Sequence, residues 1–238
     1  LLKVSGDGFD VSFDKKIGSL VSYQVGGKEL LLSPLLPDFW RGTTDNDRGA
    51  RLDKVTAWRE VRGLKNPKLT HQKVSASHLR VAVKADVGQT GATVNLTFDV
   101  MADGRVVTTV DLIPDHKKKA EVLLRFGMQV RVADELTQLD WYGHGPRETY
   151  TDRNYELIGQ YSNTVDGMFT DYSRPQENGN ISGVRSASIS NGKGRGLRII
   201  ASADAQVDIS ARRHLHETLE AYKYSYQLPP SKAVYLNI

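Results

Sequence analysis

The sequence predicts an all-β protein built from antiparallel sheets, with a few short helices. Apolar and polar residues alternate with a period of two through most of the chain, as they do in strands with one buried face. Turn residues separate consecutive runs at even intervals, which is typical of a sandwich and not of alternating strands and helices. No linker-like composition break or internal repeat divides the 238 residues, so we expect a single domain over residues 1–238.

The first 36 residues are expected to form a meander of strands. The expected strands cover residues 9–13, 17–25 and 28–32. Gly26-Gly27 supplies the positive φ angles of a tight hairpin, and residues 6–8 mark an earlier turn of the same kind.

Residues 37–49 follow neither the helical nor the strand period. They are rich in hydrogen-bonding side chains, so we expect a long polar loop anchored by an aromatic pair. Beyond this loop, Val55 and Trp58 lie three residues apart behind Asp53, a residue type that caps helix N-termini. This pattern predicts a short helix over residues 53–61.

Period-two alternation returns in the middle of the chain. The expected strands cover residues 70–75, 79–87, 93–101, 105–113 and 121–130. The glycines of residues 192–196 predict a hairpin turn, since no helical pattern follows that would make a phosphate-binding loop. Residues 214–222 have the spacing of a short amphipathic helix. Residues 234–238 alternate like a strand that is cut short, so we expect a fragment truncated at its C-terminus.

Composition excludes several classes of function. The formal net charge is +4, and the basic residues are spread along the chain except at Lys117-Lys118-Lys119, which is expected to be a solvated turn and not a nucleic-acid contact. No apolar run approaches the roughly 18 residues that a membrane span needs. There are no cysteines, which excludes disulfides and fits bacterial cytoplasm and periplasm equally.

Residues 139–185 hold most of the chemistry. Rings, carboxylates, guanidinium groups and amides lie there among Gly and Pro residues, so we expect shaped loops that suit a polyhydroxylated ring. Four aromatic residues are candidates for stacking on sugar faces, and two of the four are expected in the core: Trp141, Tyr142, Tyr150 and Tyr172.

The titratable side chains allow more than one interpretation. Glu148, Asp152 and Glu177 could provide the paired carboxylates of a glycosidase, or form ion pairs with nearby arginines that brace the loops. His144, between two glycines, could be a general acid or a hydroxyl ligand, or be satisfied by the backbone. Asp45, with a second aspartate two residues on, could bind a cation or sugar hydroxyls, or stabilise its own loop. No zinc or calcium motif occurs, so no metal site is expected.

Three motifs follow one another along the chain. They are Phe39-Trp40-Arg41 with Thr44-Asp45-Asn46-Asp47, then Trp141-Tyr142-Gly143-His144-Gly145-Pro146 with Glu148, Tyr150, Asp152 and Arg153, then Pro175-Gln176-Glu177-Asn178-Gly179. With these motifs in this order and spacing, essentially the whole chain resembles the small, C-terminal domain of glycoside hydrolase family 2 β-galactosidases.

The resemblance implies a galactose-mutarotase-like fold, an antiparallel β supersandwich. It also implies a catalytic (β/α)₈ barrel as partner, which carries the two glutamates of a retaining mechanism. The fragment itself would then be inactive, with no catalytic residue. Family members often use Mg and Na at sites outside this domain, so no cofactor is expected here. In the family, Leu236-Asn237-Ile238 would lead into a further segment with a Gly-Gly-Asp and a Ser-Trp.

The chain departs from the family pattern at three places. Gly42-Thr43 replaces Ala-Pro, Ile181 stands where an Arg is usual, and Ser186 replaces a Trp. Because a cation and a stacking surface are both lost, the resemblance does not transfer a sugar-binding role to residues 180–186.

We therefore expect a carbohydrate-binding type of domain that supports hydrolysis of β-D-galactosides by the barrel. The residues expected to contact sugar or brace the loops are Arg41, Asp45, Asn46, His144, Glu148, Asp152, Arg153, Glu177 and Asn178. Two alternatives stay open. One is an aldose 1-epimerase with His144 as acid and Glu177 as base, and the other is a free lectin-like module for galactose.

Overall fold

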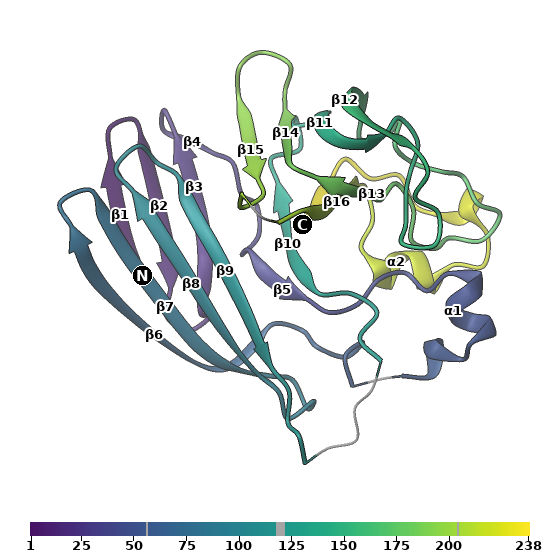
Figure 1. Ribbon diagram of the computed structural model, residues 1–238, viewed down its shortest axis with the longest axis horizontal. Coiled ribbons are helices and arrows are strands. Elements are labelled where there is room, and N and C mark those ends of the chain that lie inside the picture. Colours follow the sequence, from purple (N-terminus) through teal and green to yellow (C-terminus); the bar gives the residue numbers. More distant parts are fainter. Residues whose placement is uncertain (56, 118–121, 204) are drawn as a thin grey trace. The chain divides into compact units, whose positions relative to one another are not determined.

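The computed structural model describes residues 1–55, 57–117, 122–203 and 205–238 (Figure 1). Strands account for 48% of the chain and helices for 7%, which confirms the all-β class. The chain divides into two compact units. The first comprises Leu1–Trp40 and Lys54–Met128, and the second comprises Arg41–Asp53 and Gln129–Ile238. The expectation of one domain over residues 1–238 stays a prediction.

The first unit contains two four-stranded antiparallel sheets. One consists, in spatial order, of β1 (Leu2–Gly6), β2 (Phe9–Asp14), β3 (Ser19–Val25) and β4 (Lys28–Glu29). The other consists of β6 (Leu64–Ser75), β7 (His78–Val87), β8 (Thr93–Met101) and β9 (Val106–Ile113). Buried and half-buried residues alternate along β8, and the rings of Phe13 and Phe98 meet at 5.3 Å between centroids. The predicted period-two strands of this region are therefore confirmed.

Two of these strands, β3 and β4, are shorter than predicted. In each case a carboxylate that accepts hydrogen bonds from nearby backbone N–H groups sets the limit of the strand. The Asp14 carboxylate accepts hydrogen bonds from the backbone N–H groups of Lys16 and Ile17, so β3 begins at Ser19. The Glu29 carboxylate accepts from the N–H groups of the two residues after it, so β4 ends there. Side chains that bond to nearby backbone compete with the sheet ladder.

The segment before β6 differs from its prediction. Residues 53–61 do not form the expected helix in their described part, which excludes residue 56. The structure has a 3₁₀ turn, η1 (Leu52–Lys54), followed by further turns. Trp58 instead packs its ring against Phe39, with the centroids 5.4 Å apart. The short strand β5 (Leu36–Asp38) precedes Phe39, so part of the predicted polar loop is extended backbone.

The second unit also contains two antiparallel sheets. One has the order β12 (Leu157–Thr164), β11 (Gln138–Gly145), β14 (Ser186–Ser190) and β15 (Gly196–Ile200). The other includes β13 (Ile181–Val184), β16 (Val207–Arg212), β17 (Val234–Asn237) and β10 (Gly127–Val132) in that order. The hairpin turn predicted at residues 192–196 joins β14 to β15. The strand predicted from residue 121 begins at Gly127, and residue 121 lies outside the described residues, as do two lysines of the 117–119 run.

The stretch predicted as loops, residues 139–185, is partly sheet. Its motif Trp141 to Gly145 lies in β11, where burial alternates and Trp141 is buried while Tyr142 is exposed. The glycines and the ring types hid this alternation in the sequence. The prediction of a continuous loop region is therefore wrong for β11, β12 and β13.

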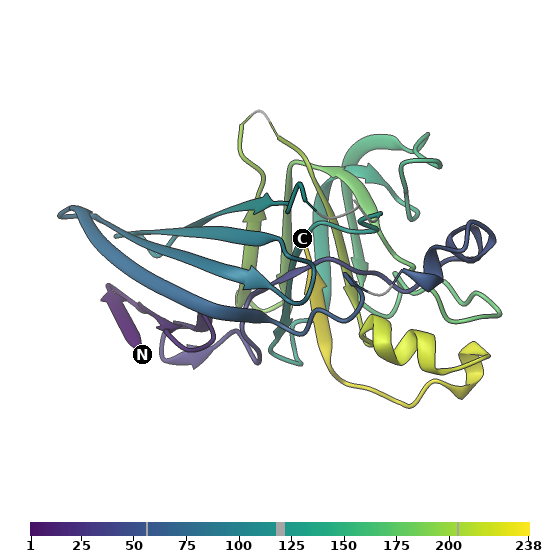
Figure 2. The same cartoon turned by 90° about the horizontal axis from the view of Figure 1, so that it is seen from below.

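The helices of the second unit are short. They are α1 (Asp45–Gly49), α2 (His216–Ala221) and the 3₁₀ turn η2 (Ser225–Gln227). Figures 1 and 2 both place α1 and α2 near one another, and the Glu220 carboxylate accepts a hydrogen bond from the Thr43 hydroxyl at 3.0 Å. The helix predicted at residues 214–222 is confirmed with tighter bounds, whereas α1 was not predicted. No helix among the described residues is long and apolar enough to span a membrane.

Candidate functional site

The three sequence motifs converge within the second unit. We call residues 41–47, 144–153 and 172–180 the three-segment cluster. The N–H of Glu177 donates to the carbonyl of Gly42 at 2.9 Å, and the N–H of Asp45 donates to the Gln176 side chain at 3.0 Å. A Cβ at position 42 would lie 3.0 Å from the Glu177 nitrogen, so glycine allows this close approach.

Glu148 connects the second and third segments. Its carboxylate accepts hydrogen bonds from the Tyr172 hydroxyl, from Arg153 and from the backbone N–H of Gly179, the last at 2.8 Å. The Glu148 side chain is only 8% exposed, so these donors replace the water that a carboxylate would otherwise bind. We infer a bracing carboxylate, one of the two interpretations that the sequence left open.

The tyrosines around Glu148 are held in the neutral form. Burial raises the pKa of Tyr150 far above its usual range, and the carboxylates of Glu177 and Glu148 raise it further. Burial and the hydrogen bond to Glu148 likewise raise the pKa of Tyr172. Hydrogen bonds with Tyr172 and Glu148 raise the pKa of Arg153. Each of these groups is therefore a hydrogen-bond donor at neutral pH.

Glu177 forms a buried ion pair. Its carboxylate accepts a hydrogen bond from Arg212, and the two side chains are 3% and 5% exposed. The next residue, Asn178, is also buried and donates its side-chain amide to the Gln176 carbonyl at 2.9 Å. These contacts fix the loop that carries Pro175 to Gly179.

Arg41 and Asp47 shape the first segment. The guanidinium group donates to both carboxylate oxygens of Asp47, at 3.2 and 2.9 Å. Asp47 also accepts from the N–H of Thr44 at 3.0 Å, while the Thr44 hydroxyl accepts from the N–H of Asp47 at 3.1 Å. This reciprocal arrangement is a capping box, and it starts α1. The spacing of Thr44 and Asp47 is the sequence signal by which α1 could have been found.

The Asp47 carboxyl makes the stability of this segment depend on pH. Burial raises its pKa, but the hydrogen bonds from Arg41 and Thr44 outweigh burial, so the pKa is lowered from its usual value. The folded state therefore gains stability from Asp47 above the carboxyl's usual pKa. That gain is lost as the pH falls through the lowered folded-state pKa.

We expect Asp47→Asn to reduce the free energy of unfolding at pH 7 by about 1–2 kcal/mol, the scale of a lost cap or charged hydrogen bond. At pH 3 the difference between wild type and variant should shrink, because the wild-type carboxyl begins to protonate. Urea unfolding at the two pH values measures this. A difference that grows in acid would contradict the assignment.

His144 is satisfied by the backbone. Its Nδ1 lies 2.6 Å from the carbonyl of Glu156. Its ring packs closely against Gly183, since a Cβ at position 183 would lie only 2.7 Å from the His144 Cδ2 atom. The His144 carbonyl accepts from the Trp141 indole at 2.8 Å.

Of the four aromatic candidates, Trp141 is buried, Tyr150 and Tyr172 are half-buried, and Tyr142 is exposed, so one residue and not two lies in the core.

The remaining candidates lie at the surface of the cluster. Asp45, Asn46 and Asp152 are exposed, and Arg153 is 45% exposed while its guanidinium group contacts Glu148. The structure thus brings Arg41, Glu148, Arg153, Glu177 and Asn178 into braced loops and leaves the other three on the outside. Within the described residues, no group of three His, Asp or Glu side chains is placed to hold a metal ion.

Several residues that build the cluster were missed by sequence reasoning. Thr149 is fully buried; its N–H donates to the Asn180 carbonyl at 2.7 Å and its hydroxyl accepts from the N–H of Ser182 at 2.8 Å. Arg212 ends β16, where apolar and polar residue types alternate as in an ordinary strand, although the last four residues are all buried. Only the presence of a charged residue in a buried run could have indicated its role.

The arrangement suits structural support better than acid–base chemistry. Both glutamates of the cluster are engaged by arginine, Glu148 by Arg153 and Glu177 by Arg212. The proposed epimerase pair is not favoured either, because Glu177 is buried against Arg212 and His144 Nδ1 is engaged by a carbonyl.

Comparisons with known proteins agree with this picture. The model of the family described as "Beta galactosidase small chain" matches residues 5–238. A beta-galactosidase of Priestia megaterium is 31% identical over 100% of this chain and 23% of its own length. One of Lactobacillus delbrueckii subsp. bulgaricus is 34% identical over 95% of this chain and 22% of its own length. One of Streptococcus thermophilus is 27% identical over 99% of this chain and 23% of its own length. The chain thus spans less than a quarter of these relatives.

Proposed function

Because the chain belongs to the β-galactosidase small-chain family, we propose that it acts as a supporting domain of a larger β-galactosidase. In this proposal a catalytic (β/α)₈ barrel outside these residues hydrolyses terminal β-D-galactosides by the retaining mechanism of glycoside hydrolase family 2. The observation that carries the proposal is that the carboxylates of Glu148 and Glu177 both form ion pairs with arginines that brace the loops.

The site residues divide into two roles. Arg41, Glu148, Glu177 and Asn178 hold the loops, because each is engaged by neighbouring segments. The residues on the outside face the barrel or the sugar that it holds, because they carry polar groups at the surface of a rigid frame. These outer residues are Asp45, Asn46 and Asp152, while Arg153 braces Glu148 and His144 positions the neighbouring strand.

Large exposed side chains of the second unit support a protein partner. Tyr155 and Leu157 are 81% and 78% exposed, and Ile158 next to them is 48% exposed. Contiguous apolar side chains at a surface are typical of interaction sites. We assign this segment to the contact with the barrel.

We expect the chain alone to hydrolyse a chromogenic β-galactoside no faster than the buffer. Adding the remaining three quarters of a β-galactosidase of the same family should produce turnover, and Leu157→Asp, which puts a charge on the proposed contact, should reduce it. Turnover by the chain alone that disappears in a Glu148→Gln/Glu177→Gln double variant with unchanged circular dichroism would overturn the proposal. Asp111→Asn is the control, because it changes one exposed charge in the first unit.

A further inference from the structure

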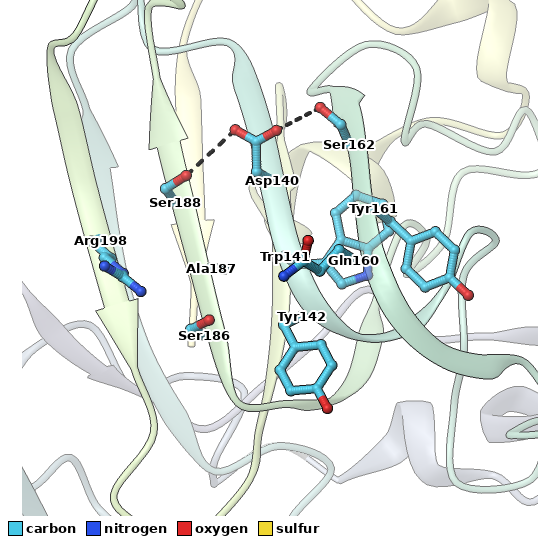
Figure 3. Close-up of a pocket in the computed structure, with 10 residues that line it drawn as sticks. All are labelled: Asp140, Trp141, Tyr142, Gln160, Tyr161, Ser162, Ser186, Ala187, Ser188 and Arg198. Carbon is cyan, nitrogen blue, oxygen red and sulfur yellow. Dashed lines mark hydrogen bonds between the residues drawn. The ribbon is translucent and has the colours of Figure 1, made fainter.

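A hollow of about 500 Å³ lies on the β12–β11–β14–β15 sheet, and none of its lining residues is a member of the three-segment cluster. Figure 3 shows Asp140 and Tyr142 on β11 with Ser186 and Ser188 beside them on β14. The register places Asp140 opposite Ser162 and Ser188, so these side chains share one face. The volume is within the range of small-ligand sites, roughly 300–1,000 Å³.

The centre of the hollow is an array of oriented oxygen atoms. The Ser162 hydroxyl donates to Asp140 at 2.6 Å, and the Ser188 hydroxyl donates to its other carboxylate oxygen at 3.4 Å (Figure 3). Because each serine uses its proton on Asp140, the serine oxygens keep their lone pairs for other donors. The array is therefore rich in acceptors and suits a ligand with several hydroxyl groups.

Hydrogen-bond donors and an aromatic ring lie beside this array. Arg198 pairs with Ser188 in the register of β14 and β15 and is exposed, and its guanidinium group makes no hydrogen bond to the described part of the chain. Gln160 lies opposite Tyr142 on the same face. Tyr142 is 44% exposed, and the Arg185 guanidinium group lies 6.0 Å from its ring centroid. Asp140 and Tyr142 are two residues apart along β11, a spacing of about 7 Å, so both can contact one saccharide.

The charges of the hollow favour a ligand without net charge, because Asp140 and Arg198 give it one charge of each sign. Polar groups and apolar surface both line the hollow, with Tyr142 as an exposed ring, and a sugar offers hydroxyl groups and apolar ring faces to match them. We propose that this hollow binds a neutral saccharide, with Tyr142 against the sugar face and Asp140, Ser188 and Arg198 bonded to its hydroxyl groups. This site is separate from the proposed supporting role and does not depend on it.

Calorimetric titration of the full chain with lactose tests the proposal. We expect millimolar binding that Tyr142→Ala weakens about tenfold, a change of roughly 1.4 kcal/mol. Tyr142→Phe keeps the ring and should retain most of the affinity. Tyr226→Ala removes a tyrosine that is 82% exposed elsewhere, and should leave binding unchanged.

A second pair of measurements separates this site from the cluster. Asp140→Asn should weaken lactose binding while leaving hydrolysis by the assembled enzyme within about twofold at saturating substrate. Sorbitol, a polyol without a ring, should bind less well than lactose. The proposal is overturned if lactose shows no heat at tens of millimolar, or if Tyr142→Ala with unchanged circular dichroism binds as tightly as wild type. Normal lactose binding by Asp140→Asn together with a loss of hydrolysis would also overturn the proposal, because Asp140 would then serve the assembled enzyme and not this site.

Discussion

Replacement of Arg212 by methionine will lower the free energy of unfolding by about 3–5 kcal/mol, because it leaves the buried Glu177 carboxylate without its cation. A carboxylate that is 3% exposed cannot recover this interaction from water without opening the loop. Urea denaturation followed by far-ultraviolet circular dichroism measures the loss. The same variant should increase proteolysis at the loop that carries Pro175 to Gly179.

Two further variants control this experiment. Arg80→Met breaks a surface pair with Asp99, in which the Arg80 side chain is 49% exposed, and should change the free energy of unfolding far less than Arg212→Met does. Combining Arg212→Met with Glu177→Gln removes both charges and should recover part of the loss. If Arg212→Met costs no more than Arg80→Met, the ion pair does not brace the loop.

Replacement of Glu148 by alanine will cost about 2–4 kcal/mol, because donors from three places lose one acceptor together. Those donors are Arg153, the Tyr172 hydroxyl and the N–H of Gly179. Hydrogen exchange at the Gly179 amide should become faster, which reports the loop directly. Glu148→Gln keeps one acceptor oxygen and should cost less.

Glu156→Ala is the matched control for this second experiment. Glu156 pairs with Arg147, whose side chain is 82% exposed, so its removal should cost less than about 1 kcal/mol. Exchange at Gly179 should stay at the wild-type rate in this variant. Equal effects of the two alanine variants would show that the position of Glu148 has no special role.

The fold class could be predicted because strand alternation is a local signal. β8 matches its predicted limits at residues 93–101, because its apolar residues are the buried ones and they alternate with polar residues in the sequence. Where side chains bond to the backbone, local alternation misleads, as at Glu29, whose carboxylate ends β4. The helix expected at residues 53–61 is missing for a different reason, because Trp58 packs on Phe39 from a distant part of the chain.

The sequence indicated which segments come together in the candidate site, but not which side chains contact each other there. The motifs that contain Arg41, Glu148 and Glu177 converge, as their spacing and the family resemblance indicated. The partner of Glu177 was not found, because Arg212 lies 35 residues away and in a different strand. Sequence also left the role of His144 open, and only the Glu156 carbonyl next to its Nδ1 indicates that the backbone satisfies it.

The division of the chain into two units has a consequence for how its gene can be cut. The polypeptide passes between the two units after Trp40, after Asp53 and after Met128, so neither unit is one continuous stretch of codons. A single stretch of gene that carries the whole of one unit also carries a piece of the other. A deletion that ends at any one of the three crossings therefore leaves at least one unit incomplete.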